Sequence, residues 1–359
     1  MSDGTVSLGS VAMPRKARDP RSFATSKDVA ALAGVSQSTV SYVMSGKRII
    51  SDYTRGRVEE AMRELAYHPN AGARALRAAK TNVIALMVQL GAASDLDETA
   101  PYIETIIDAA QQRDFDVVLS TSNEGPQGIE RLAGRRISDA FVIMDVRADD
   151  DRVEAAADLG LPVVLLGRTA EARGLDQIDF DSYRAAELLV DELADTGHRH
   201  IVLLSDGVHE QQSRFIFIKD FWTGALNRAS ERSVDLRILQ REGDGWAGLT
   251  AIADVVLHDQ GDRLGLIARN PRMTEWLLQL LRVRGLQPGI DVSLVSMCND
   301  DAAQVFVPPV TNVSAEAQEV SRLAMRVLFE RIDGDEQPSR LELVRPERVT
   351  RRGTTVVFN

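Results

Sequence analysis

The chain has 359 residues, too many for one ordinary domain, and its 44% hydrophobic and 26% charged residues are typical of soluble globular proteins. Its single cysteine, Cys298, excludes a disulfide framework or a thiolate metal cluster within the chain, and its apolar runs are too short for a transmembrane helix. The net charge of -11, taken as a whole, argues against a nucleic-acid partner.

The charge is divided unevenly along the chain. Residues 14–80 contain 13 Lys and Arg against 6 Asp and Glu, a net charge of +7. Residues 81–359 contain 29 basic and 46 acidic residues, a net charge of -17. A short basic segment on a large acidic body predicts a nucleic-acid-binding tether on an otherwise ordinary domain.

Residues 1–23 are rich in Ser, Gly and Pro and then become basic, without the apolar core of a secretory signal. We therefore expect a disordered leader on a cytoplasmic protein.

Three short helices are predicted within residues 24–66. Thr25 and Asp28 form a capping-box pattern at the start of the first, and Gly34 suits a turn that needs positive φ. Ser36 is placed to cap the second helix. The residues expected to face inward are Val29, Leu32, Val40, Val43, Val58, Met62 and Leu65. Helix, glycine-containing turn and helix together predict a helix-turn-helix domain.

The second helix is the candidate recognition helix. Its outer side carries short hydrogen-bonding groups and one aromatic ring, which are Gln37, Ser38, Ser41 and Tyr42. Such groups suit base edges and phosphates in a major groove, and flanking Lys and Arg residues suit phosphate neutralisation. For any one of these residues, a solvated polar helix face is an equally good interpretation.

Residues 67–80 are predicted to be a hinge that becomes ordered only in context, because Pro69 can open a helix that Gly72 then weakens.

From Asn82 onward, short apolar runs alternate with amphipathic stretches. The runs predict buried strands at 83–88, 115–120, 141–144, 163–166, 201–204, 264–268 and 292–297. The stretches between them predict helices at 103–112, 183–196, 274–284 and 315–332. This alternation predicts parallel sheets, and residues 81–359 suffice for two α/β lobes with a ligand cleft between them.

Two segments resemble the LacI/GalR family of bacterial transcription regulators. Residues 25–41, reading TSKDVAALAGVSQSTVS, are similar to its DNA-binding head, and residues 68–76, reading HPNAGARAL, are similar to its hinge. Weaker similarities continue to residue 355, as at 196–201, 285–293 and 308–313. The resemblance implies a helix-turn-helix head, a hinge and a two-lobe parallel α/β body of the periplasmic-binding-protein type.

The resemblance also implies a homodimer that binds a pseudo-palindromic operator in double-stranded DNA. It implies that Leu76 wedges between bases of the minor groove, which agrees with an apolar residue in a basic linker. The other implied DNA contacts are Ser36, Gln37, Ser38, Thr39, Asn70 and Ala73. The family usually has arginine where this chain has Tyr42, so Tyr42 is retained as a contact but the family's base preference does not transfer.

For the cleft, the resemblance implies a small-molecule effector, a sugar or related metabolite, that changes operator affinity by a population shift. The candidate contacts are Asp149, Trp246, Asn270 and Cys298. The family's charged cleft residues are replaced here, with Ile218 in place of an arginine and Pro271 and Cys298 in place of aspartates. An effector-independent regulator, or one that responds to a non-sugar ligand or a protein partner, therefore stays open.

Enzyme motifs are absent from the sequence. It has no His-Glu-x-x-His, no P-loop, no Gly-x-Ser-x-Gly elbow and no glycine fingerprint after the first strand. The acidic run 149–151 favours a helix start on a solvated surface over a metal site. We expect no catalytic residue, metal or cofactor, and we expect Cys298 to be a buried small side chain rather than a redox sensor.

A stand-alone sugar receptor would share the two-lobe body. It would need an export signal and would lack the basic head, so residues 1–80 argue against it.

Overall fold

The computed structural model describes residues 24–45, 48–67, 80–90, 96–121, 124–205, 215–240, 245–258 and 263–358. The chain divides into two compact units, residues 1–79 and residues 80–359, each with a hydrophobic core of its own. The expected leader, 1–23, lies outside the described residues, and the boundaries at 24–66, 67–80 and 81–359 stay predictions.

The first unit contains three short helices, α1 (Ser26–Ala33), α2 (Gln37–Ser45) and α3 (Asp52–Glu64). Both halves of the predicted capping box are present at Thr25, and Gly34 ends α1 in the left-handed region at φ 62°. The prediction that Leu32 faces inward is wrong, since it is 45% exposed. In this eight-residue helix the buried side chains are Val29, Ala30 and Ala33, which form a narrower stripe than the prediction assumed.

The second unit begins with a six-stranded parallel sheet in the order β11-β5-β4-β3-β1-β2. Its strands are β1 (Val83–Val88), β2 (Asp116–Thr121), β3 (Ala140–Ile143), β4 (Val163–Leu166), β5 (Asp176–Phe180) and β11 (Leu341–Val344). Side chains of β1 alternate between two cores, with Ile84 and Leu86 in one and Ala85 and Met87 in the other.

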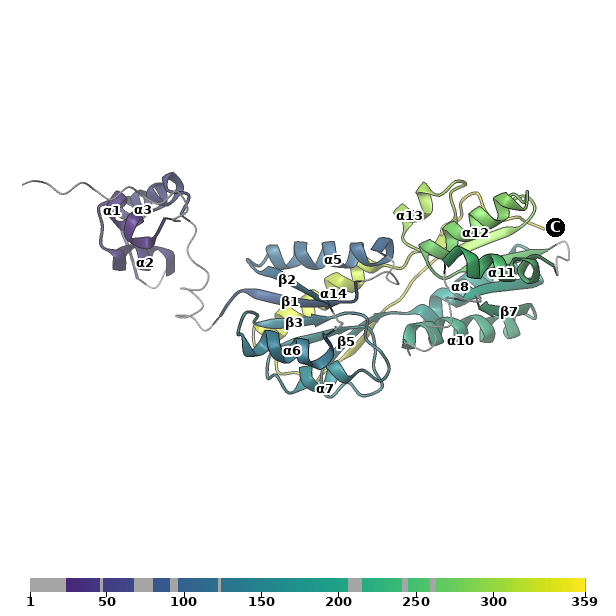
Figure 1. The fold of residues 1–359 in the computed structure, drawn as a ribbon, viewed down its shortest axis with the longest axis horizontal. Coiled ribbons are helices and arrows are strands. Elements are labelled where there is room, and N and C mark those ends of the chain that lie inside the picture. The colour runs from purple at the N-terminus through teal and green to yellow at the C-terminus, as the bar shows by residue number, and fades with distance from the viewer. Residues whose placement is uncertain are drawn as a thin grey trace, which may run out of the picture. The chain divides into compact units, whose positions relative to one another are not determined.

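Helices cover both faces of this first-lobe sheet (Figure 1). Side chains of α5 (Leu96–Gln111) and α14 (Ala317–Ile332) pack in the core on one face. Side chains of α6 (Gly125–Gly134) and α7 (Asp151–Ala157) pack on the other. The helix α5 begins before the predicted residue 103, with Pro101 inside it.

The second lobe repeats this arrangement around a five-stranded parallel sheet in the order β10-β9-β8-β6-β7. The strands are β6 (His200–Ser205), β7 (Asp235–Gln240), β8 (Leu264–Ala268), β9 (Ser293–Met297) and β10 (Thr311–Val313). Its helices are α8 (Ser182–Asp195) and α10 (Ile216–Glu231) on one face, α11 (Gly245–His258) and α12 (Pro271–Val283) on the other, and the short α13 (Asp300–Val305).

The predicted two-lobe fold is confirmed, and every predicted strand is present to within one residue. The chain passes between the lobes after β5, after β10 and again after β11, where Thr350 bridges back to Asn312. One apolar cluster continues through both lobes. Within the described residues, no helix is long and apolar enough to cross a bilayer.

Gly224 permits the close packing of α10 on α8. A Cβ at this position would lie 2.4 Å from the Tyr183 carbonyl oxygen, which is backbone and cannot rotate away. We expect Gly224→Ala to lower the free energy of unfolding of the body by about 1–3 kcal/mol through overpacking. Denaturant unfolding of the full chain measures this. Gly134→Ala is the control because nothing lies within 4 Å of its Cβ, and equal effects of both substitutions would contradict the prediction.

Candidate DNA-binding face and inter-lobe cleft

Helix α2 is fixed in the head by its own polar side chains. Ser36 Oγ accepts a hydrogen bond from the Thr39 N–H at 3.1 Å and lies 2.7 Å from Ser38 Oγ, so Ser36 caps the helix as predicted. Gln37 Nε2 donates to Ser26 Oγ at 2.8 Å, which joins the start of α2 to the start of α1. The N-terminal end of the candidate recognition helix is therefore held at two points.

The outer side of α2 has the composition that the sequence predicts. Val40 is fully buried, whereas Gln37, Ser38 and Tyr42 are exposed and Ser41 is half-buried. This face is polar and contains one aromatic ring, so it can offer both hydrogen bonds and a flat apolar surface to base edges.

Two arginines are stacked on tyrosines of the head. The guanidinium of Arg48 lies 5.6 Å from the ring centroid of Tyr42, within the range of a cation–π contact. Arg57 lies 5.7 Å from the ring of Tyr53 and also donates to the Ala33 carbonyl oxygen at the end of α1. The flanking cations thus adjoin the helical surface, as an interface with a phosphate backbone requires.

The remaining predicted DNA contacts, Asn70, Ala73 and Leu76, lie outside the described residues, as does Lys47. Their roles stay predictions from the family resemblance.

In the body, an arginine bridges the two lobes. Arg168 follows β4, and its Nε donates to Asp179 Oδ2 on β5 at 2.9 Å. Its Nη2 donates to Asp220 on α10, in the other lobe. Burial has the largest effect on Asp179 and raises its pKa. The hydrogen bond and the charge of Arg168 act to lower this pKa, but burial outweighs them.

A second arginine crosses between the lobes in the opposite direction. Arg269 directly follows β8, and its Nη1 lies 3.6 Å from Glu98 Oε1 on α5. Its guanidinium lies 5.3 Å from the ring centroid of Phe217 on α10. The side chain is only 4% exposed. The sequence interpretation missed this group, because its partners are distant in the chain and no local motif joins them.

The first-lobe wall near Arg269 is acidic. Burial first, and then the charges of Glu98, Asp179 and Asp145, raise the pKa of Tyr102, while Arg269 lowers it. Burial also raises the pKa of Asp145, although its Oδ2 accepts a hydrogen bond from the Gln89 N–H at 2.7 Å. Carboxylates therefore cluster around Tyr102 at the lobe junction.

The predicted effector contacts differ in burial and in the element to which each belongs. Asn270 is 6% exposed and caps α12, its Oδ1 accepting from the Met273 N–H at 2.8 Å. Trp246 on α11 packs partly buried against the second-lobe core. Cys298 is 1% exposed, and burial raises its pKa to about 11, as expected of a buried unreactive thiol. Asp149 is exposed between β3 and α7.

Three family models match successive parts of the chain. Residues 25–70 match the bacterial regulatory proteins of the lacI family. Residues 97–214 match the periplasmic binding proteins and sugar binding domain of the LacI family, and residues 190–355 match a periplasmic binding protein-like domain. The chain belongs to the LacI family.

Curated relatives are similar to this chain over most or all of their length. The HTH-type transcriptional regulator CelR of Thermobifida fusca is 29% identical over 88% of this chain and 94% of CelR. The HTH-type transcriptional repressor PurR of Vibrio atlanticus is 26% identical over 94% of this chain and 100% of PurR. By name, both are regulators of transcription.

Solved structures of LacI-family proteins have the same fold. The lac repressor dimer bound to operator and the anti-inducer ONPF matches with a TM-score of 0.77 and 22% identity, covering 93% of this chain and 99% of that chain. A complex of the transcriptional regulator CelR with cellobiose matches with a TM-score of 0.65 and 23% identity, covering 92% and 100%.

The position of the family's cleft arginine is buried in this chain. Ile218, aligned above with the family's arginine, is 3% exposed and belongs to the buried side of α10. Phe217, one position earlier, contacts Arg269 instead. A helical step of one residue rotates the side chain by about 100°, so residues 217 and 218 face different directions.

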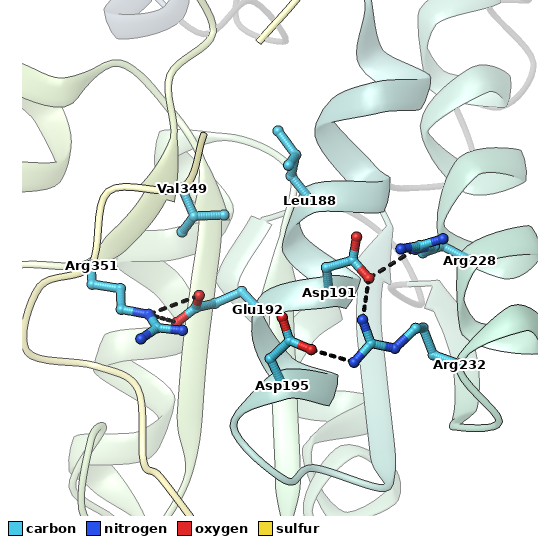
Figure 2. A pocket seen from close by; sticks show the side chains of 8 residues that line it. All are labelled: Leu188, Asp191, Glu192, Asp195, Arg228, Arg232, Val349 and Arg351. Atoms are coloured by element: carbon cyan, nitrogen blue, oxygen red, sulfur yellow. Dashed lines mark hydrogen bonds and ion pairs between the residues drawn. The ribbon is translucent and has the colours of Figure 1, made fainter. Parts of the chain in front are cut away.

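An open hollow of about 640 Å³ lies on the second lobe of this LacI-family chain (Figure 2). In it Glu192 of α8 holds Arg351 at 2.7 and 2.9 Å, and Asp191 holds Arg228 and Arg232, each at 2.8 Å. The charged groups neutralise one another across α8, α10 and the C-terminal segment. We interpret these ion pairs as structural contacts that hold the three segments together, and we do not interpret the hollow as a ligand site.

Proposed function

We propose that this chain is a sequence-specific, double-stranded-DNA-binding transcriptional regulator of the cytoplasm, acting as a repressor. The observation that carries the proposal is the capped helix α2, whose exposed Gln37, Ser38 and Tyr42 lie beside stacked arginines in a segment of net charge +7. The acidic body disfavours phosphate contacts elsewhere, so the head supplies the DNA-binding surface.

The residues proposed to contact DNA comprise two sets. On the described head they are Ser36, Gln37, Ser38, Thr39 and Tyr42. In the hinge they are Asn70, Ala73 and the wedge Leu76, by the family resemblance. Major-groove side chains specify bases, whereas an intercalating leucine bends the duplex, so both sets serve one operator.

We further propose a homodimer on a pseudo-palindromic operator. Exposed apolar side chains support it: Val118 and Leu119 on the edge strand β2 are 37% and 42% exposed, and Val255 and Val283 on α11 and α12 are 54% and 68% exposed. Apolar side chains on a sheet edge favour cover by another chain. The lac repressor structure named above is a dimer bound to its operator.

The proposed effector is a small molecule in the inter-lobe cleft, a sugar or related metabolite, with Asp149, Trp246, Asn270 and Cys298 as proposed contacts. An effector-independent regulator is the second candidate. It is favoured by the two ion pairs that already join the lobes, Arg168 with Asp220 and Arg269 with Glu98. A panel of sugars and nucleosides that leaves operator affinity unchanged would select this second candidate.

Selection of bound duplexes from a random pool by the purified full chain tests the DNA-binding proposal. We expect a two-fold symmetric motif, and we expect Leu76→Ala to weaken binding to it by about tenfold or more, the equivalent of roughly 1.4 kcal/mol. Leu226→Ala, at an exposed body position, is the control. Absence of any enriched motif would contradict the proposed function, and an unchanged affinity for Leu76→Ala would contradict only the wedge.

A further inference from the structure

The guanidinium of Arg269 lies where ligands of two-lobe α/β proteins bind. It directly follows the central strand β8 at its carboxyl end, and it touches the opposite lobe through Glu98. Ligands of parallel α/β sheets bind beyond the carboxyl ends of the strands, and ligands of multi-lobe proteins bind between lobes. An internal cation therefore lies where a ligand would be expected.

The surroundings of Arg269 have the chemistry of a cation site. One lobe supplies the face of Phe217, 5.3 Å from the guanidinium, and the other supplies the Glu98 carboxylate at 3.6 Å. An aromatic face and a carboxylate together stabilise a buried cation that would otherwise be costly to desolvate. A neutral sugar could pack on the ring and donate to the carboxylate, but it would bring no positive charge to offset Glu98.

The wider charge balance of the junction also favours a cation. The pKa of Tyr102 is raised, after burial, by Glu98, Asp179 and Asp145, so these carboxylates face a common region. Arg168, another guanidinium at the junction, is already engaged by Asp179 and Asp220. Removal of Arg269 would leave this wall with an excess of negative charge.

We propose that the inter-lobe cleft is a cation site occupied by the chain's own Arg269, and that a free guanidinium or ammonium compound binds there once this side chain is removed. The two lobes are then held together by Arg269 in the absence of an effector. The site itself is independent of DNA binding. Only its consequence for operator affinity depends on the proposed function.

Chemical rescue of Arg269→Ala in the full chain tests the proposal. We expect the melting temperature of the body to fall by several degrees, and we expect millimolar ethylguanidinium to restore it with a binding isotherm in calorimetry. Ethylurea, which has a similar shape without the charge, should not restore it. The wild-type chain should bind neither compound.

Two control variants separate the site from general effects. Arg284→Ala removes a surface arginine that pairs with Asp254 at 2.7 Å, and ethylguanidinium should not affect that variant. Adding Glu98→Gln to Arg269→Ala should abolish the rescue. Equal rescue by ethylurea, rescue of Arg284→Ala, or no binding of ethylguanidinium to folded Arg269→Ala would overturn the proposal.

If Arg269→Ala does not fold, Arg269→Lys and Arg269→Gln decide the matter. The lysine variant keeps a cation beside Phe217 and Glu98 and should fold with a higher melting temperature than the glutamine variant. A glutamine variant as stable as the lysine variant would show that charge is not what the cleft requires. The DNA selection described above is unaffected by either result, so the two proposals fail separately.

Discussion

Removal of residues 1–80 is expected to abolish operator binding altogether. The removed segment contains the head and the hinge and has a net charge of +6, and the remaining body has a net charge of -17, which repels a phosphate backbone. The intact chain should bind with steep salt dependence. For 6–10 phosphate contacts, affinity falls by about 10³–10⁵-fold between 50 and 200 mM salt. Fluorescence anisotropy with the selected operator, measured over a salt series, provides both results.

The body provides its own control in this experiment. Its apolar cores contain no side chain of the head, so the truncated chain should keep the native secondary structure of the body. Operator binding by a folded body lacking residues 1–80 would show that the acidic lobes contact DNA. A shallow salt dependence of the intact chain would show that few phosphates are neutralised.

The buried strands of the body could be predicted from the sequence because both of their faces are covered. Strands β3 and β4 are buried at every position, so they form uninterrupted apolar runs. The missed strands β7 and β11 lie at or near sheet edges and alternate exposed and half-buried residues. Strands β5 and β10 were missed although they are buried, because Asp176 and Asp179 interrupt the apolar pattern of β5 and because β10 is only three residues long.

Those two aspartates show why the sequence is less informative about long-range contacts than about the head. Asp176 holds Arg331 of α14 at 2.8 Å, and Asp179 holds Arg168, so each is explained by a partner outside its own segment. In the head, by contrast, the cap at Thr25 and the turn at Gly34 are formed by neighbouring residues. Local signals survive in the sequence, whereas ion pairs between distant segments arise only from the tertiary fold.

The sequence predicts that the acidic run 149–151 is a helix start on a solvated surface, and one of its residues departs from this prediction. Asp151 is exposed, as a solvated helix start should be, but Asp150 is buried with its side chain capping α7. The Asp150 Oδ1 accepts from Arg152 Nε at 2.9 Å, and Oδ2 accepts from Arg152 Nη2 at 2.7 Å. Arg152 also donates to the Asp145 carbonyl oxygen at 2.8 Å, which ties the end of β3 to the helix.

We expect Asp150→Asn to lower the free energy of unfolding by about 3–5 kcal/mol at neutral pH, because it leaves the charge of Arg152 buried without its counter-ion. Asparagine still caps helices, so the loss reports the charge rather than the cap. Asp151→Asn, at the exposed neighbour, should cost less than about 1 kcal/mol. Urea unfolding of the three chains measures the difference, and equal losses for the two substitutions would contradict a buried pair.

The same pair predicts how stability depends on pH. Burial acts to raise the pKa of Asp150, but the hydrogen bonds and charge of Arg152 outweigh it and hold the pKa below its ordinary value. A depressed pKa in the folded state gives stability that is complete above the unfolded value, about 3.9, and is lost as pH falls through the folded value. The gap between wild type and Asp150→Asn should therefore be constant near neutrality and shrink below about pH 4. A gap that shrinks instead as pH rises would show that Asp150 is protonated in the folded chain and that Arg152 is neutralised by another group.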